Sequence, residues 1–135
     1  MTKICTACPL HEHAKTNCLN GDGPIPCDLM VVGQGPGWEE DKIGKVFVGD
    51  SGRILNKLLH DAGFSRKTTR ITNSTRCYGG KSGTGDNKPK AAEIRACSSW
   101  LAKEIQKCEP KVIIACGDVA IESLVGDGSI SSTRG

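Results

Sequence analysis

The residues best suited to chemistry in this sequence are cysteines that form two pairs far apart in the chain. Cys5 and Cys8 form a CxxC motif followed by a proline, whereas Cys77 follows a predicted strand and Cys97 lies in a helical pattern. Four thiolates that folding brings together can hold either a tetrahedral zinc ion or an iron–sulfur cluster. The spacing of these cysteines leaves both metals open.

The other four cysteines have weaker claims to be ligands. Cys18 and Cys27 lie in an irregular segment, Cys108 ends a predicted helix and Cys116 ends an apolar run. Such cysteines are more often small apolar side chains than ligands. Regular helix and strand patterns, together with an N-terminus unlike a secretory signal, argue against a disulfide scaffold. We therefore expect a reducing, cytoplasmic environment.

A second candidate site is the stretch GQGPGWEEDKIGKVFVGDSG, which begins at Gly33 and is rich in glycine and acidic residues. Glycines let the main chain approach a ligand closely, and a helix that begins after such a loop offers free amides to an anion. The stretch does not match a dinucleotide-binding loop, because the next helix starts too far downstream, and the sequence contains no GxxxxGK[ST] motif. An ordinary surface loop rich in turn residues is the alternative.

Strand and helix patterns alternate three times along the chain. Strands are predicted over residues 28–32, 70–76 and 111–116, and helices over 51–63, 89–108 and 117–126. This alternation predicts a three-layer α/β/α fold with a central parallel sheet. The glycine loop and Asn73 would then meet at the carboxyl-end rim of the sheet. Residues 79–88, which are polar and glycine-rich, are predicted to form a mobile loop.

Composition sets the broad class of the protein. With 135 residues, 37% hydrophobic and 24% charged, the sequence predicts one domain over residues 1–135. No apolar run is long enough to cross a membrane. A formal charge of +3 permits a polyanionic partner without requiring one. We expect a monomer that does not enter a membrane.

Five segments together resemble the iron–sulfur (family 4) uracil-DNA glycosylases. The longest, GQGPGWEEDKIGKVFVGDSGRILNKLL, is similar to that family's first motif, whose pattern is close to GE[AG]PGxxED..G.PFVG.AG.LL. The others are CTACPL, ITNSTRC, EIRACSSWLAKEI and KVIIACGDVAIESLVG. The resemblance covers nearly the whole chain. It implies the uracil-DNA glycosylase fold, uracil-containing DNA as the partner, and hydrolysis of the N-glycosidic bond of uracil in base-excision repair.

The resemblance also implies a cofactor. Its four ligands would be Cys5, Cys8, Cys77 and Cys97, which would hold a structural [4Fe-4S] cluster, with zinc as the alternative. Such a cluster would fix the ends of the polar loop over residues 79–88.

Five residues of the motifs would form the site. The resemblance makes Gln34 and Glu40 the catalytic, water-positioning residues and places Gly35 beside the substrate. Phe47 would stack on a flipped base, and Asn73 would pair with O4 and N3–H of uracil.

The sequence departs from the family in three places. Gln34 replaces the usual acid and cannot act as a general base, although it can hold a water molecule. Val46 replaces the usual proline before Phe47, which should loosen the loop. The sequence stops at SISSTRG, where the family continues into a fourth strand and a histidine-proline-serine motif. The three histidines do not match that motif and are predicted to be solvated: His11, His13 and His60.

Whether the protein is an enzyme therefore stays open at this stage. The chain is either a fragment or a natural short form that lacks the histidine segment. A uracil-DNA glycosylase is the first hypothesis. The alternatives are a non-catalytic DNA- or protein-binding module derived from this fold, and a zinc-stabilised structural protein.

Overall fold

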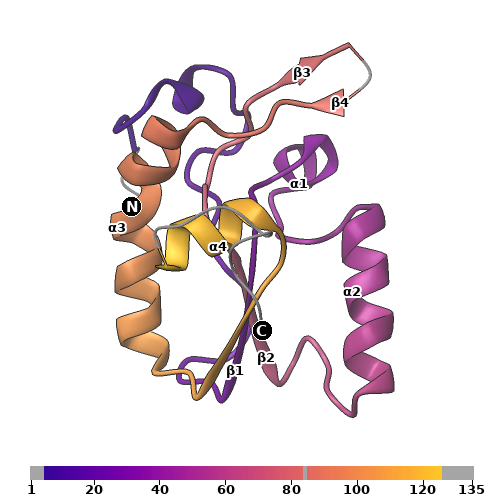
Figure 1. Cartoon of the computed structure of the whole chain (residues 1–135). Helices are drawn as coiled ribbons and strands as arrows, with labels where there is room; N and C mark the ends of the chain where they lie inside the picture. The colour runs from indigo at the N-terminus through magenta and orange to yellow at the C-terminus, as the bar shows by residue number, and fades with distance from the viewer. Residues whose placement is uncertain (1–4, 84, 126–135) are drawn as a thin grey trace.

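A computed structural model describes residues 5–83 and 85–125, and its main sheet contains three parallel strands (Figure 1). These are β1 (Leu29–Gly33), β2 (Thr69–Asn73) and β5 (Val112–Ala115), in the order β2-β1-β5. Both neighbours of β1 pair with it in parallel. Parallel pairs need long crossovers, and helices fill those crossovers here. The predicted α/β class with a parallel sheet is confirmed.

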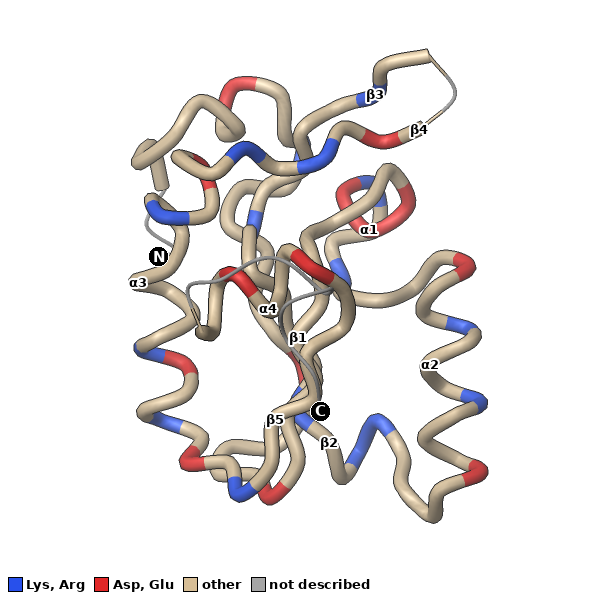
Figure 2. Tube along the Cα trace, viewed as in Figure 1, with Lys and Arg blue, Asp and Glu red and all other residues tan. Residues whose placement is uncertain are grey.

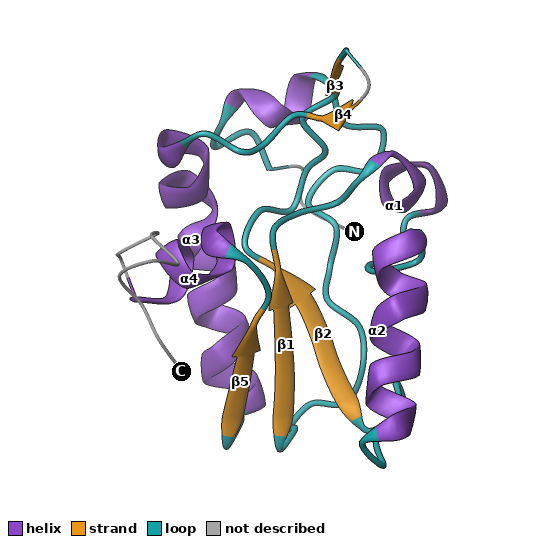
Figure 3. Cartoon of the chain, turned by 45° about the vertical axis from the view of Figure 1, so that its right-hand side comes forward, coloured by secondary structure: helices purple, strands orange, loops and turns teal. Residues whose placement is uncertain are grey.

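Helices cover both faces of this sheet (Figure 3). They are α2 (Asp50–Asp61) on one face, with α3 (Ala91–Cys108) and α4 (Asp118–Val125) on the other. Val31 of β1 lies in one buried cluster with Leu59 of α2, whereas Met30 and Val32 lie in another with Leu101 of α3. Because successive strand residues point to opposite faces, β1 is apolar throughout. This central strand connects the two halves of the core.

Two regions of the structure differ from the prediction. The glycine loop contains a short helix, α1 (Trp38–Ile43), and the loop predicted to be mobile folds in part into the hairpin β3 (Lys81–Ser82) and β4 (Gly85–Asp86). A 3-10 turn, η1 (Pro9–Glu12), follows the first cysteine pair. The buried Tyr78 hydroxyl donates to Asp86 Oδ1 at 2.7 Å, which attaches the hairpin to the domain.

The loops after β1 and β2 stay side by side beyond the strands. The main-chain N–H of Ser74 donates to Gly33 O at 2.9 Å, and that of Thr75 donates to Gln34 O at 3.1 Å. This pairing places the start of the glycine loop beside the residues that follow β2. Among the described residues, no helix is both long and apolar enough to span a membrane. The prediction about the last residues of the chain falls within 126–135, outside the described residues.

Candidate functional site

A cleft of about 590 Å³ lies at the carboxyl ends of all three strands of the main sheet. Gly33 ends β1, Asn73 ends β2 and Cys116 follows β5, and all three line the cleft. Loops converge at this edge of a parallel sheet, which is where ligands of such folds bind. The remaining predicted site residues also line it: Gln34, Gly35, Glu40 and Phe47.

Phe47 and Asn73 both approach the position where a side chain of Gly33 would lie. A methyl group on Gly33 would lie 2.4 Å from Cζ of Phe47 and 2.8 Å from Oδ1 of Asn73. Both distances are too short for a real methyl group, so one of the two side chains would have to move, and glycine leaves room for both where they are. Asn73 is 3% exposed and Phe47 is half-buried. The cleft therefore offers an aromatic ring and a buried amide close together.

Arg66 holds the main chain at Phe47. Its Nη1 donates to Phe47 O at 2.8 Å and its Nη2 donates to Val46 O at 2.7 Å. Phe47 has a φ of 50°, a left-handed conformation that costs an L-residue free energy. Arg66 helps to hold this unfavourable conformation. Its two hydrogen bonds support a loop that the sequence predicts to be loose, because Val46 replaces a proline.

Glu40 fixes the other side of the same loop. Its Oε2 accepts main-chain N–H groups from Val48 at 2.9 Å and Gly49 at 2.7 Å, and its Oε1 accepts that of Gly37 at 3.0 Å. A carboxylate bonded to three main-chain amides organises the loop before and after α1. Its predicted catalytic role stays a prediction, and the contacts describe a positioning residue.

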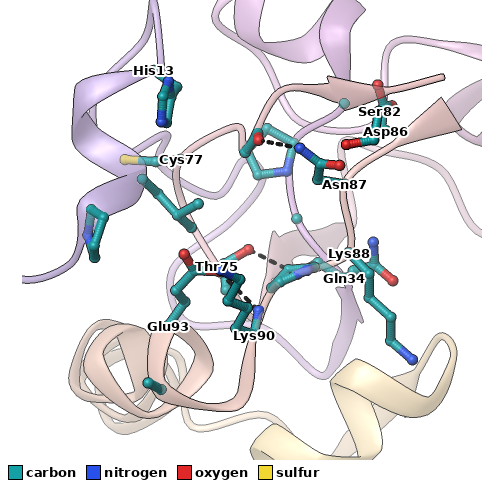
Figure 4. A pocket seen from close by; sticks show the side chains of 18 residues that line it. His13, Gln34, Thr75, Cys77, Ser82, Asp86, Asn87, Lys88, Lys90 and Glu93 are labelled. Atoms are coloured by element: carbon teal, nitrogen blue, oxygen red, sulfur yellow. Dashed lines mark hydrogen bonds between the residues drawn. The ribbon is translucent and has the colours of Figure 1, made fainter.

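Gln34 and Gly35 form a wall shared with a second cavity. Gln34 is exposed at the edge of the cleft, and a methyl group on Gly35 would lie 2.3 Å from Thr75 Oγ1. On the far side of this wall lies a cavity of about 580 Å³, which the sequence did not predict. Figure 4 shows Gln34 and Thr75 beside it, with Lys88 and Lys90 contributed by the segment that leads into α3. Polar and basic groups thus continue from the cleft along the rim.

The four predicted cysteine ligands line one small cavity. Cys5 and Cys8 come from the N-terminal segment, Cys77 follows β2, and Cys97 lies on α3. In the described part of the chain, no group of three or more His, Cys, Asp and Glu side chains is arranged to hold a single metal ion. The four cysteines therefore line one cavity, but their sulfur atoms are not arranged around a single metal position.

Cys18 is a fifth cysteine in that cavity, a position that the sequence did not predict. Its main-chain N–H donates to Cys77 Sγ at 3.2 Å. Burial raises the pKa of the Cys97 thiol to about 12 and also raises that of Cys77. An isolated cysteine in an irregular segment carries no spacing signal, which explains why Cys18 was missed.

Arg76 is the basic residue of the cysteine cavity. It is 4% exposed, and its Nε is buried without a hydrogen-bond partner among the described residues. A buried donor without an acceptor is costly, so this atom calls for a negatively charged or accepting group in the cavity. The cavity thus combines thiols with a buried guanidinium that pairs with Glu104 through Nη2 and keeps its Nε N–H without an acceptor in the part of the chain that the structure describes.

Comparison with known proteins identifies the family. A family model described as the uracil DNA glycosylase superfamily matches residues 20–134. A type-4 uracil-DNA glycosylase of Thermotoga maritima is 38% identical over 98% of this chain and 66% of its own length. Similar proteins of the same name occur in Pyrobaculum aerophilum, 34% identical over 93% of this chain and 61% of the relative, and in Saccharolobus solfataricus, 35% identical over 84% and 50%.

The chain spans about half to two thirds of the length of these curated relatives. The similarity includes both the glycine loop and the cysteine-bearing helix, since the matched segments cover most of the chain. The predicted resemblance to family 4 uracil-DNA glycosylases is therefore confirmed, and the chain belongs to the uracil DNA glycosylase superfamily.

Proposed function

We propose that this protein removes uracil from DNA by hydrolysing its N-glycosidic bond, as a step of base-excision repair. The observation that carries the proposal is the pairing of Phe47 and Asn73 around Gly33, in a cleft at the carboxyl ends of the strands. The names of the type-4 relatives support it. The partner is uracil-containing DNA, which a monomer would bind at this rim.

Base recognition falls to Phe47 and Asn73. An enzyme that acts on a base must take it out of the stack and hold it against an apolar surface while reading its edge. The ring of Phe47 supplies that surface. The Asn73 amide donates to uracil O4 through Nδ2 and accepts N3–H through Oδ1, whereas cytosine presents the reverse pattern. Burial of Asn73 makes a mismatched base costly, because its polar atoms would be left unpaired.

The reaction breaks the bond between C1′ of the sugar and N1 of uracil, and water forms a new C1′–O bond. Uracil leaves as its N1 anion, and the proton that the attacking water loses passes through solvent to neutralise it, so that uracil and an abasic site are the products. Gln34 holds this water by hydrogen bonds at the exposed edge of the cleft, and its amide does not accept the proton. Glu40 fixes the loop that carries Phe47 through its three main-chain bonds.

The cysteine cavity suits a [4Fe-4S] cluster, with zinc held by the same cysteines as the alternative. Cys5, Cys8, Cys77 and Cys97 would supply the four thiolates. A negatively charged cluster would also suit a cavity that the buried Arg76 lines. When bound, the cluster supplies a structural cross-link between the N-terminal segment, the residue after β2 and α3.

All eight cysteines are free thiols. Free thiols in this number fit a reducing compartment, and we place the protein in the cytoplasm on that ground. Disulfide formation would compete with cluster assembly for the same sulfur atoms. Protein for any assay that depends on the cluster should therefore be isolated gently and without oxygen.

Metal analysis tests the cofactor. We expect iron and acid-labile sulfide in protein isolated without oxygen, and a strong loss of both in Cys77→Ser. Cys108→Ser is the matched control. Cys108 does not line the cysteine cavity, and it lies in the buried apolar cluster that contains Met30 and Val32. Zinc in stoichiometric amount, without iron, would establish the alternative metal instead.

Release of uracil from single-stranded and mispaired oligonucleotides tests the activity. Removal of one group that stabilises the transition state typically costs about 10²- to 10³-fold in rate, and we expect a decrease of that size in Phe47→Ala and in Asn73→Ala. Phe64→Ala is the matched control, since Phe64 is exposed beyond the end of α2. Full activity in both cleft variants would refute the assignment of the pocket. Binding of DNA without any release would point to the non-catalytic module, which the glutamine at position 34 favours.

A further inference from the structure

Trp38 stands at the mouth of the cleft and is strongly exposed. It is the first residue of α1 and lines the cleft together with Phe47 and Asn73. Its relative solvent exposure is 49%. The chain has only two tryptophans, and the other, Trp100, lies on α3 and lines none of the described cavities. A large exposed aromatic side chain at a binding cleft marks a contact surface.

Two lysines from different elements approach the ring of Trp38. The ammonium nitrogen of Lys42 lies 4.7 Å from the ring centroid, and that of Lys81 lies 5.5 Å from it. Lys42 is four residues further along α1, whereas Lys81 comes from strand β3 of the hairpin. Both distances are within the range of a cation–π interaction. Positive charge is thus held beside an aromatic face at the entrance to the cleft.

The hairpin that carries Lys81 is fixed in this place. Asp86 accepts a hydrogen bond from the buried Tyr78, and its Oδ2 would lie 3.0 Å from a methyl group on Gly37, directly before Trp38. The hairpin therefore packs against the start of α1. Its position brings Lys81 beside the ring.

A polynucleotide strand matches this arrangement. Successive nucleotides present a flat base and a phosphate, which suit an aromatic face and ammonium groups respectively. The lining of the cleft also carries the carboxylates of Glu39 and Asp50, which repel phosphate and so favour a path for the backbone past Lys42 and Lys81 at Trp38. With uracil beside Phe47, as the proposed function has it, a neighbouring nucleotide of the strand would lie toward Trp38.

We propose that Trp38, with Lys42 and Lys81, forms a stacking platform for the base next to the flipped nucleotide, with the two lysines binding the flanking phosphates. The site takes single-stranded DNA or a locally opened duplex, because a base paired within a duplex has no free face. This inference rests on the proposed function for the location of the DNA, and it requires no chemistry at Trp38.

Tryptophan fluorescence gives a direct test. In Trp100→Phe the only tryptophan is Trp38, and titration with a uracil-free oligothymidine should quench its emission. The reciprocal variant Trp38→Phe retains Trp100, which also has a lysine beside it at 5.5 Å, and its emission should not change. Trp38→Ala should weaken oligothymidine binding about tenfold, since stacking of one base is worth about 1–3 kcal/mol. Trp38→Phe should restore most of this affinity.

The outcomes separate this inference from the proposed function. Oligothymidine binding that leaves Trp38 emission unchanged, with equal affinity in Trp38→Ala, would show that the lysines merely cover the ring and would overturn the platform. An absence of binding to oligothymidine would overturn it as well. Quenching and weakened binding in a protein that releases no uracil would support the platform while contradicting the proposed function. Circular dichroism checks that Trp38→Ala is folded. We expect that it is, because the Trp38 side chain is exposed.

Discussion

Gly33 lines the cleft and leaves room there because it has no side chain. A methyl group at this position would collide with both Phe47 and Asn73. We expect Gly33→Ala to displace one of these side chains and to lower uracil release by about 10²-fold, because a displacement of about 1 Å at a reacting site has that effect. Excision kinetics on a single-stranded substrate provide the measurement.

The fold should survive that substitution well enough for the test to be clear. Alanine is compatible with the extended strand that Gly33 ends, and the clash involves side-chain atoms. Thermal unfolding of the variant checks this point. A Gly33→Ala protein with full activity would show that the ring of Phe47 and the amide of Asn73 do not bind the same base.

The placement of single residues was predictable to different extents. The sequence brought Phe47 and Asn73 to one rim, because an aromatic residue in a polar loop and an amide at the end of a strand each require a reason, and both line the cleft, while their roles stay predictions. The sequence did not predict the positions of Trp38 and Cys18. Their surroundings depend on which distant segment packs beside them, namely the hairpin in one case and Cys77 in the other. Sequence spacing does not encode such contacts.

The element that shapes the pocket is the loop between α1 and α2, and Arg66 is its external support. Two main-chain carbonyls of that loop accept hydrogen bonds from this one guanidinium. We expect that Arg66→Ala removes the support for the left-handed conformation of Phe47, so that this residue leaves it and its ring is displaced. The rate of uracil release should then fall by about ten- to a hundredfold. The exposed Arg95 of α3 gives the control variant Arg95→Ala, which should keep full activity.

The kinetic pattern of Arg66→Ala distinguishes positioning from stability. Because Arg66 is only partly buried, the melting temperature should fall little while kcat falls. A decrease in activity that merely follows the fraction of unfolded protein would contradict a positioning role. Restoration of kcat by Arg66→Lys would contradict it too, because one ammonium cannot reproduce two bonds from a planar fork.

At the level of elements, the sequence predicted the strands and the three longer helices but neither α1 nor the hairpin. Apolar residues mark elements that face a core: β1 is an unbroken apolar run, and α2 carries Leu55 and Leu59 at helical spacing against the core. The helix α1 has six residues and depends on Glu40, which accepts the main-chain N–H of Gly37. The hairpin has exposed strands and is attached through Tyr78 and Asp86. Both owe their shape to polar contacts, which leave no periodic pattern.

The whole molecule is held together by a buried network centred on Glu104 of α3. Its carboxylate accepts from Arg70 Nε at 2.7 Å, from Thr72 Oγ1 at 2.6 Å and from Arg76 Nη2. Arg70 also donates to Gly23 O at 2.8 Å. The network therefore joins α3, β2 and the N-terminal segment, and it places Arg76 at the cysteine cavity.

This network predicts a dependence of stability on pH. Burial alone would raise the pKa of Glu104, but Arg76 and the hydrogen bonds from Thr72 and Arg70 outweigh it and lower the pKa below the ordinary 4.5. A lowered folded-state pKa gives stability that is fully present above the unfolded-state value and is lost as the pH falls through the folded-state value. Urea unfolding from neutral pH into the acid range should show this decrease in stability.

The variant Glu104→Gln tests the source of that dependence. At neutral pH it leaves the buried guanidinium of Arg76 and the partly buried one of Arg70 without this charged partner, which should destabilise the fold by about 3–5 kcal/mol. Its deficit relative to the parent protein should shrink as the pH falls and Glu104 becomes protonated. Glu109→Gln, at an exposed position directly after α3, should leave both the stability and its pH profile unchanged. A constant deficit at every pH would show that the charge of Glu104 is irrelevant.

Binding of DNA is a property of the whole charge distribution, and the position of the lysines should matter more than their number. The formal charge of +3 is too small to draw DNA to every face, and Figure 2 shows basic residues on the segment between β4 and α3. Lys88 and Lys90 lie there, beside the second cavity. Lys88 is also paired with Asp118 at 2.5 Å, an exposed ion pair that contributes little to stability. These two lysines can therefore turn to phosphates without cost to the fold.

Two double variants with the same change of charge show whether the position of the lysines or the net charge governs DNA binding. Lys88→Ala with Lys90→Ala and Lys57→Ala with Lys103→Ala each lower the formal charge from +3 by two, to +1. If placement governs binding, only the first pair should weaken the affinity for a single-stranded oligonucleotide and flatten its dependence on salt. The slope of log K against log salt should fall by about 0.7 for each phosphate that a lysine no longer neutralises. Equal weakening in both variants would mean that net charge alone attracts the DNA, because Lys57 on α2 and Lys103 on α3 line neither the cleft nor the second cavity.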